Sequence, residues 1–294
     1  MSYRTILVPV GQADNAASAI AAGFLIAKRF GGHVHGLHVL PDLTKPATHA
    51  LIATRMTAEE ASSDFRRFSA TAEREVRRQA VEVKRLFDEG AARVGAPTLD
   101  SAAGGAADRP SASWQSITGF ESEIVGRLGR IFDLTVIAQR GPRGASHDTV
   151  EAALVETGRP LLLVPPEPPT SVGDAVLLAW NASPQAARAA AAALPFLTQA
   201  ARVVVMAVGN GPEPEPSADQ LARSLAWHGV AAEARHVEQG SRRVRDILLA
   251  EAKDLQVDLL VIGAYSHSRM RQIVFGGVTE HMLDHADLPI LMTR

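Results

Sequence analysis

The chain has 294 residues, 46% of them apolar, and its 30 basic and 32 acidic residues give a net charge of −2. This near balance excludes a protein that coats a nucleic acid, because phosphate contacts require a clear excess of basic residues. The absence of cysteine excludes disulfides, thiolate catalysis, cysteine-ligated zinc and iron–sulfur clusters.

The length of the chain limits the number of domains, and its apolar segments indicate where in the cell the protein is located. At about 150 residues per domain, the chain is long enough for two modest domains or one large one. No apolar run approaches the roughly 18 residues that a membrane span requires, and the first residues lack the features of a signal peptide. We therefore expect a cytoplasmic protein with no membrane partner and no nucleic-acid partner.

In the first half, short β-branched runs alternate with helical patterns, which is typical of βαβ units around a parallel sheet. Strands are predicted over residues 5–10, 33–40, 114–118, 134–138 and 160–164. Helices are predicted over residues 16–30, 57–94, 121–131 and 149–156. The small, Gly-rich segment 98–112 predicts a mobile loop.

A proline-rich segment then interrupts the pattern, with Pro165, Pro166, Pro168 and Pro169 in five residues. Proline cannot donate to a sheet and favours a stiff extended chain, so this segment is predicted to be a linker. The predicted organisation is one domain over 1–165, a linker over 166–173 and a second domain over 174–294.

The second half repeats the order of elements in a shorter form. Strands are predicted over residues 175–180, 202–208, 232–237, 259–262 and 289–292. Helices are predicted over residues 184–197, 217–228, 242–253 and 277–285. The two copies align at Asp133-Leu-Thr-Val-Ile-Ala and Asp258-Leu-Leu-Val-Ile-Gly, and they differ most in the loop that follows.

That loop in the second copy, residues 263–279, suits a phosphate group. Small residues allow a ligand to approach the backbone closely, and Gly276-Gly277 begins a helix whose free N–H groups and dipole favour anions. His267, Arg269 and Arg271 add basic side chains. The alternative is a glycine-containing turn that only connects a strand to a helix.

With these features, the whole chain resembles a tandem universal stress protein. The openings Ile6-Leu-Val-Pro-Val10 and Val176-Leu-Leu-Ala-Trp-Asn-Ala-Ser183 are similar to the family's first strand and turn, and residues 263–292 to its closing segment. The resemblance implies an α/β fold of two tandem, open, five-stranded parallel-sheet domains. It also implies that residues 160–164 and 289–292 pair edge to edge, giving an intramolecular pseudo-dimer without exposed closing edges.

The ATP-binding branch of that family has Gly-x2-Gly-x9-Gly followed by Ser or Thr. Here Gly263 and Gly276 match, whereas Ser266 replaces the second glycine and Gly277 replaces the hydroxyl residue, for which Thr279 is a nearby substitute. The resemblance further implies that Asn181 replaces the aspartate that contacts the nucleoside and that the Val208 backbone recognises adenine. The predicted nucleotide-binding residues are Asn181, Val208, Gly263, Ser266, His267, Arg269, Gly276, Gly277, Val278 and Thr279.

The first copy departs further from this pattern. Gly11 stands where the family has its first-strand aspartate, although Asp14 is nearby. The segment 139–144 cannot complete a glycine-rich phosphate motif before the next helix begins. We therefore expect this copy to be degenerate for nucleotide and to serve as the pairing partner, with its long helical stretch and its Gly/Ala loop covering part of the shared surface.

Other residue clusters have simpler interpretations. A metal site at His33, His35 and His38 is disfavoured, because strand alternation places His38 on the opposite face. His281 and His285 indicate a solvated helix end more than a metal pair. The basic turn over residues 242–245 indicates solvated surface rather than a phosphate contact. The three tryptophans, 114, 180 and 227, indicate core or interface anchors.

Enzyme motifs are lacking. The sequence has no Gly-x-Gly-x-x-Gly after the first strand of either copy, no Gly-x4-Gly-Lys-Ser/Thr and no Gly-x-Ser-x-Gly. The resemblance implies a stress-response protein that binds ATP or a related adenine nucleotide in its second domain, with Mg²⁺ only when ATP is bound. The lack of these motifs favours sensing over turnover. Two alternatives are a nucleotide-free interaction scaffold with both sites closed and a slow ATPase. Self-association beyond the pseudo-dimer is left open.

Overall fold

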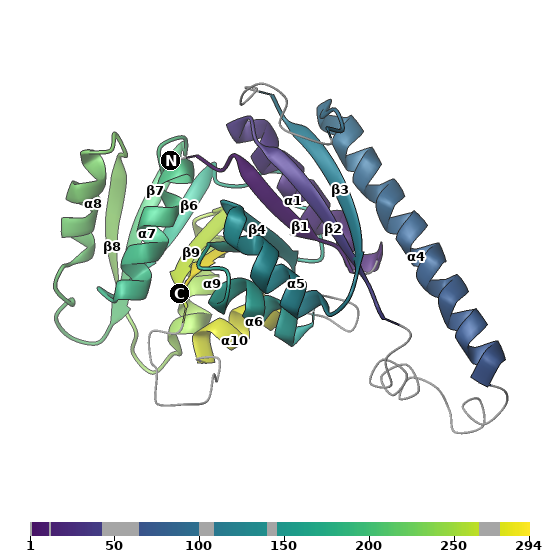
Figure 1. The fold of residues 1–294 in the computed structure, drawn as a ribbon. Helices are drawn as coiled ribbons and strands as arrows, with labels where there is room; N and C mark the ends of the chain where they lie inside the picture. The colour runs from purple at the N-terminus through teal and green to yellow at the C-terminus, as the bar shows by residue number, and fades with distance from the viewer. Residues whose placement is uncertain (1, 12, 43–64, 100–108, 140–145, 265–276) are drawn as a thin grey trace.

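The computed structural model describes residues 2–11, 13–42, 65–99, 109–139, 146–264 and 277–294, and ten strands in these segments form one continuous sheet (Figure 1). Their order across the sheet is β3-β2-β1-β4-β5-β10-β9-β6-β7-β8. Each half therefore contributes five adjacent strands, and the second half repeats the strand order of the first in reverse. This is the predicted fold class.

The predicted strands are all present, with small shifts at their ends. In the first half they are β1 Thr5–Pro9, β2 His33–Leu40, β3 Ser111–Thr118, β4 Leu134–Ala138 and β5 Leu161–Val164. In the second half they are β6 Ala175–Trp180, β7 Arg202–Gly209, β8 Ala232–Glu238, β9 Leu259–Gly263 and β10 Ile290–Thr293.

The helices also follow the predicted order. In the first half they are α1 Ala13–Phe30, α4 Phe65–Val94, α5 Glu121–Leu128 with the 3-10 turn η1 Gly129–Ile131, and α6 His147–Val155. In the second half they are α7 Pro184–Leu197, α8 Ala218–Ala226, α9 Val244–Asp254 and α10 Gly277–His285. No helix in the described segments is long and apolar enough to cross a membrane.

The two halves join through their closing strands. Strands within each half are parallel, whereas β5 and β10 pair antiparallel, with Leu162 opposite Leu291. Both strands consist almost entirely of fully buried aliphatic residues. The predicted edge-to-edge pairing within one chain is thus confirmed, and two strand edges that would be prone to aggregation lie inside the sheet.

Helices cover both faces of the sheet, and each face has its own hydrophobic core. One core packs beneath α1, α4, α7 and α8, and the other beneath α5, α6, α9 and α10. Both cores continue across the junction. On the first face, the rings of Tyr3 and Phe30 each pack against Phe196 with centroids 5.2 Å apart. Burial of apolar surface on both faces therefore stabilises the joint between the halves.

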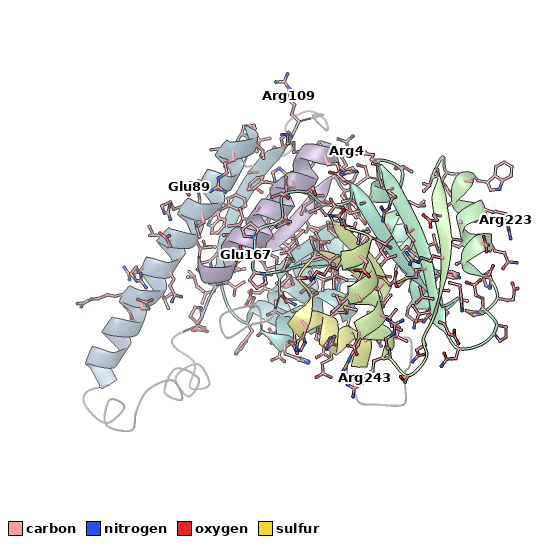
Figure 2. All side chains as sticks on the ribbon, turned by 180° about the vertical axis from the view of Figure 1, so that it is seen from behind. Arg4, Glu89, Arg109, Glu167, Arg223 and Arg243 are labelled. Carbon is pink, nitrogen blue, oxygen red and sulfur yellow. The ribbon has the colours of Figure 1, made fainter. Side chains whose placement is uncertain are left out.

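The crossover helix of the first half is much longer than its counterpart. α4 connects β2 to β3 as α8 connects β7 to β8, and it has 30 residues where α8 has nine. It packs against α1, β2 and β3 and stands at the outer end of the sheet (Figure 1). Figure 2 shows Glu89 on α4 and Arg223 on α8 at opposite ends of the molecule. The expectation that this helix covers the surface shared by the halves was therefore wrong.

Two further predictions in this region change. β3 begins at Ser111, three residues before the predicted start, because residues 111–118 pair with the whole of β2. Thr98 also forms an isolated bridge with Ala112, so the ends of the predicted loop 98–112 are tied to the sheet. Residues 57–64 of the predicted helix and 100–108 of that loop lie outside the described residues.

The three tryptophans have different environments. Trp180 is buried, and Trp114 packs against Phe87 with ring centroids 5.0 Å apart. Trp227 follows α8 and is 92% exposed, so it is not a core anchor, and its alternative assignment as an interface anchor stays a prediction. The apolar face of α8 ends at Leu225, which is buried, and Trp227 lies beyond it as the C-cap.

The aspartates that align the two copies have equivalent structural roles. Asp133 accepts hydrogen bonds from the backbone N–H groups of Arg4 and Thr5, both at 2.9 Å. Asp258 accepts from the backbone N–H groups of Gly173, Asp174 and Ala175 at 2.9–3.1 Å. Each carboxylate therefore fixes the chain where it enters the first strand of its half.

We expect Asp258→Asn to lower the free energy of unfolding by about 1–2 kcal/mol, because one carboxamide oxygen cannot replace two charged acceptors for three N–H groups. Urea unfolding would measure this change. Asp254→Asn, at an exposed position at the end of α9, is the matched control and should change the stability by less than about 0.5 kcal/mol. Equal stability of the two variants would contradict the proposed role of Asp258.

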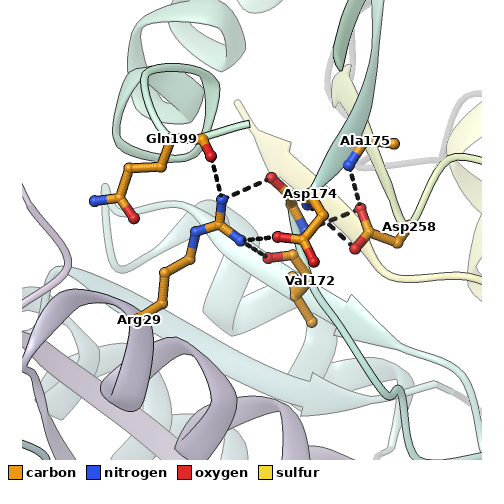
Figure 3. A network of polar contacts seen from close by, with 7 residues as sticks. Arg29, Val172, Asp174, Ala175, Gln199 and Asp258 are labelled. Carbon is orange, nitrogen blue, oxygen red and sulfur yellow. Dashed lines mark hydrogen bonds and ion pairs between the residues drawn. The ribbon is translucent and has the colours of Figure 1, made fainter. Parts of the chain in front are cut away.

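A guanidinium group ties the first half to the entry of the second (Figure 3). Arg29, in the last turn of α1, donates to the carbonyls of Val172, Gly173 and Gln199 at 3.0–3.1 Å. It also donates to the Asp174 carboxylate at 2.6 Å. The Arg29 side chain is 16% exposed, whereas Asp174 is 63% exposed, so the carbonyl contacts contribute more than the solvent-screened ion pair.

Candidate functional site

A cavity of about 380 Å³ opens at the carboxyl ends of β6, β7 and β9. Strand order reverses there, because β6 lies between β7 on one side and β9 on the other. This is where open α/β sheets bind ligands, and the volume is within the range of small-molecule pockets. Its lining residues are Ala179, Trp180, Asn181, Ala186, Met206, Val208, Val244, Leu248, Ile262, Gly263, Gly277, Val278 and Thr279.

The structure brings most of the predicted ligand-binding residues together in this cavity. Those that line it are Asn181, Val208, Gly263, Gly277, Val278 and Thr279, from four separate segments of the chain. The other predicted residues, Ser266, His267, Arg269 and Gly276, lie outside the described residues. The convergence of distant segments at one cavity supports the assignment of the site to the second half.

The turn from β6 into α7 shapes one side of the cavity. Ser183 caps α7 by accepting a hydrogen bond from the Ala186 N–H, and Asn181 Oδ1 accepts from the Ser183 N–H at 3.2 Å. Ala182 between them adopts φ +55°, a left-handed conformation that costs energy for a residue with a side chain. Asn181 is thus held at the cavity by the same turn that starts the helix.

Gly263 allows the next strand to approach that turn. A Cβ atom at this position would lie 2.5 Å from both the Ala186 nitrogen and the Gln185 carbonyl carbon, which are backbone atoms that cannot move aside. Glycine is therefore required where β9 meets the first turn of α7. The glycine spacing predicts Gly263 to be the first residue of a phosphate motif. Its close packing against α7 is a second reason for glycine at this position.

The inner wall of the cavity is apolar. Met206, Leu248 and Ile262 are buried side chains of the second core, and Val208 and Val244 pack against it. Trp180 closes another side, and its indole N–H donates to the Pro216 carbonyl at 2.7 Å. An apolar wall of this kind suits a flat ring system, and the exposed start of α10 suits an anion.

A basic side chain that the sequence did not single out lies at the start of α10. Arg245 Nη1 donates to the Gly277 carbonyl at 3.2 Å, and the Arg245 side chain is 24% exposed. Among the described residues, its Nε is buried and has no hydrogen-bond acceptor. From the sequence, Arg242, Arg243 and Arg245 are all predicted to be solvated surface. In the structure Arg242 and Arg243 are exposed, whereas Arg245 is partly buried.

Comparison with known proteins decides the family. A family model described as the universal stress protein family matches residues 2–98 and 160–294. The chain belongs to this family. No protein with a curated description matches it in sequence.

Solved structures of universal stress proteins share the fold over the whole chain. One from Archaeoglobus fulgidus has a TM-score of 0.65 at 14% identity and covers 100% of this chain and 99% of its own. A putative universal stress protein from Pseudomonas aeruginosa has a TM-score of 0.57 at 15% identity, covering 99% and 93%. At these identities the likeness supports the tandem fold alone.

The first half of this universal stress protein has a different group at the corresponding place. The Glu121 carboxylate, at the start of α5, faces Gly11 at the end of β1, where an added Cβ would lie 3.7 Å from both carboxylate oxygens. Burial raises the pKa of Glu121, and a hydrogen bond from the Thr149 side chain partly offsets this effect. Thr149 lies in the first turn of α6, the counterpart of α10. Residues 140–145 lie outside the described residues.

The histidines on β2 form a hydrogen-bonded ladder with β3. The Ser113 hydroxyl lies 2.7 Å from His33 Nε2 and 2.8 Å from His35 Nδ1. Burial lowers the pKa of both histidines. His38 lies on the opposite face as predicted, stacked on Trp114, and no group of three or more metal-ligating side chains occurs among the described residues.

The histidine pair on α10 lies near the cavity but not in it. The rings of His281 and His285 stack with centroids 4.3 Å apart, and His285 Nδ1 lies 3.2 Å from the His281 carbonyl. His281 Nε2 lies 3.6 Å from Asp246 Oδ1. Burial lowers the pKa of His281, and so do the charges of Arg245 and His285. The pair is therefore part of the helix surface beside the site.

Proposed function

We propose that this universal stress protein binds ATP or a related adenine nucleotide in the second-half cavity, and that binding acts as a signal rather than a step in turnover. The observation that supports the proposal best is that six predicted ligand-binding residues from separate segments line one cavity at the strand-order reversal. Mg²⁺ would accompany the triphosphate.

The chemistry of the cavity agrees with such a ligand. The apolar wall of Met206, Leu248 and Ile262 offers a dry surface for a base. The start of α10, with the flanking guanidinium of Arg245, offers backbone N–H groups and positive charge for phosphates. The sequence contains none of the enzyme motifs named above, so the proposal assigns sensing and not catalysis.

Isothermal titration calorimetry with ATP, ADP, AMP and adenosine tests the proposal. We expect one site per chain for ATP with Mg²⁺. At a free ATP concentration of 100 Kd, binding should add about 2.7 kcal/mol to the free energy of unfolding, which differential scanning fluorimetry detects as a rise of a few degrees in Tm. GTP serves as the control for recognition of the base.

Two other outcomes correspond to the alternative functions. Absence of binding heat, together with absence of nucleotide in the denatured purified protein, would overturn the proposal and favour an interaction scaffold. ATP hydrolysis that persists after repurification and is lost in a cavity variant would instead identify a slow ATPase.

A further inference from the structure

The N-terminal parts of two helices contribute to the lining of the second-half cavity. Val244 and Leu248 of α9 line the cavity, as do Gly277, Val278 and Thr279 of α10. Arg245 lies between these helix starts, since it is in the first turn of α9 and donates to the Gly277 carbonyl. A fixed positive charge therefore lies next to the end of α10 whose backbone N–H groups favour an anion.

The Arg245 guanidinium lies beside the cavity and not in its lining, and the Arg245 side chain is 24% exposed. Its Nε has no hydrogen-bond acceptor among the described residues, and Asp246 Oδ1 lies 3.6 Å away, beyond hydrogen-bond distance. Asp246 is 53% exposed, so water weakens this ion pair. Gly277 has no side chain, and a Cβ there would be 4.0 Å from Arg245 Nη1, so nothing on that residue stands between the guanidinium and the helix start.

We propose that Arg245 is the side chain that recognises the phosphate groups of the ligand in this cavity. The inference rests on the proposed function and names the group that holds the anionic end of the ligand. A guanidinium suits this role, because its planar set of donors matches two phosphate oxygens at once.

The first half supports the same assignment by contrast. α5 connects β3 to β4 as α9 connects β8 to β9, so Glu121 and Arg245 both lie in the first turn of the equivalent helix. The carboxylate of Glu121 faces Gly11 and accepts a hydrogen bond from Thr149, at the start of the helix equivalent to α10. The side chain at this position is therefore acidic in the first half and basic in the second, and we expect only the second half to accept a phosphate-bearing ligand.

The test compares ligands with different numbers of phosphates. Calorimetric Kd values are measured for adenosine, AMP, ADP and ATP with the full-length wild type, Arg245→Gln and Arg245→Glu. We expect Arg245→Gln to weaken ATP binding about 10- to 50-fold and to change adenosine binding by less than twofold. Arg245→Glu, which places the acidic residue of the first half here, should eliminate measurable ATP binding and spare adenosine.

Arg243→Ala is the matched control. Arg243 is exposed, makes no side-chain hydrogen bond to the start of α9, and projects from the body at the lower edge of Figure 2. The Arg243→Ala substitution also removes one positive charge, two residues from Arg245, so ATP binding should stay within twofold of wild type. Equal losses of ATP and adenosine binding in Arg245→Gln, or no loss, would overturn the assignment while leaving the proposed function intact. Failure of the wild type to bind any of the four ligands would overturn both.

Discussion

Replacing Ala179 by phenylalanine is expected to weaken nucleotide binding by at least about 100-fold, or about 2.7 kcal/mol, while the protein stays folded. Ala179 is partly exposed, lines the cavity and pairs across the sheet with Met206. An aromatic ring at this position would occupy the space in which the base is proposed to bind. Because the ring enters an open cavity rather than a filled core, the free energy of unfolding should change by less than about 1.5 kcal/mol.

Calorimetry with ATP and adenosine, paired with urea unfolding, measures both quantities. Val237→Phe is the control, because Val237 is opposite Val208 on the neighbouring strand, is also partly exposed and does not line the cavity. The control should bind ATP as the wild type does. A folded Ala179→Phe variant that retains wild-type affinity would show that the ligand does not use this cavity.

Replacing Arg29 by alanine is expected to lower the free energy of unfolding by about 3–4 kcal/mol. The change removes donors from three carbonyl oxygens at the entry of the second half, those of Val172, Gly173 and Gln199. Carbonyls that lose a donor and stay shielded from water pay a desolvation cost as well as the lost bond. Differential scanning calorimetry should detect a lower Tm.

Lys28→Ala controls for the charge in the last turn of α1, because Lys28 is adjacent, exposed and basic. It should change the stability by less than about 0.5 kcal/mol. Arg29→Lys is expected to recover part of the loss only, because a single ammonium group cannot reach carbonyls that the two ends of a guanidinium span. An Arg29→Ala variant as stable as Lys28→Ala would assign the joint to apolar packing alone.

The strands were predictable because most of them are short runs of buried β-branched and aliphatic residues. Leu134–Ala138 and Leu259–Gly263 are examples. Short, continuous apolar runs within a βαβ pattern are typical of parallel strands that are buried on both faces. β3 was less visible, since Ser111-Ala-Ser has little intrinsic preference for a strand. Pairing with β2 determines where β3 begins, and that information is not local.

The site was predictable to the extent that it follows topology and glycine spacing. Gly263 and Gly277 were identified from the motif, and the structure places both at one cavity. Arg245 was not identified as a site residue. The sequence shows a helical turn with three arginines, but not which of them faces the site. Which one does so depends on how α9 lies on the sheet, with Ile247 and Leu248 buried beneath it. The residue that Arg245 contacts, Gly277, is distant in sequence, so the contact could not be predicted from the local pattern.

The antiparallel join of β5 and β10 has a consequence for how the two halves meet. A segment of ten residues, from Pro165 to Asp174, connects β5 to β6, so the partner surfaces are tethered at a high effective concentration. Their pairing should therefore not depend on dilution, whereas separate domains would dissociate as the protein concentration falls. The tether also fixes a one-to-one ratio of the first half to the second. One half can therefore lose its ligand site without forming pairs of two site-free halves.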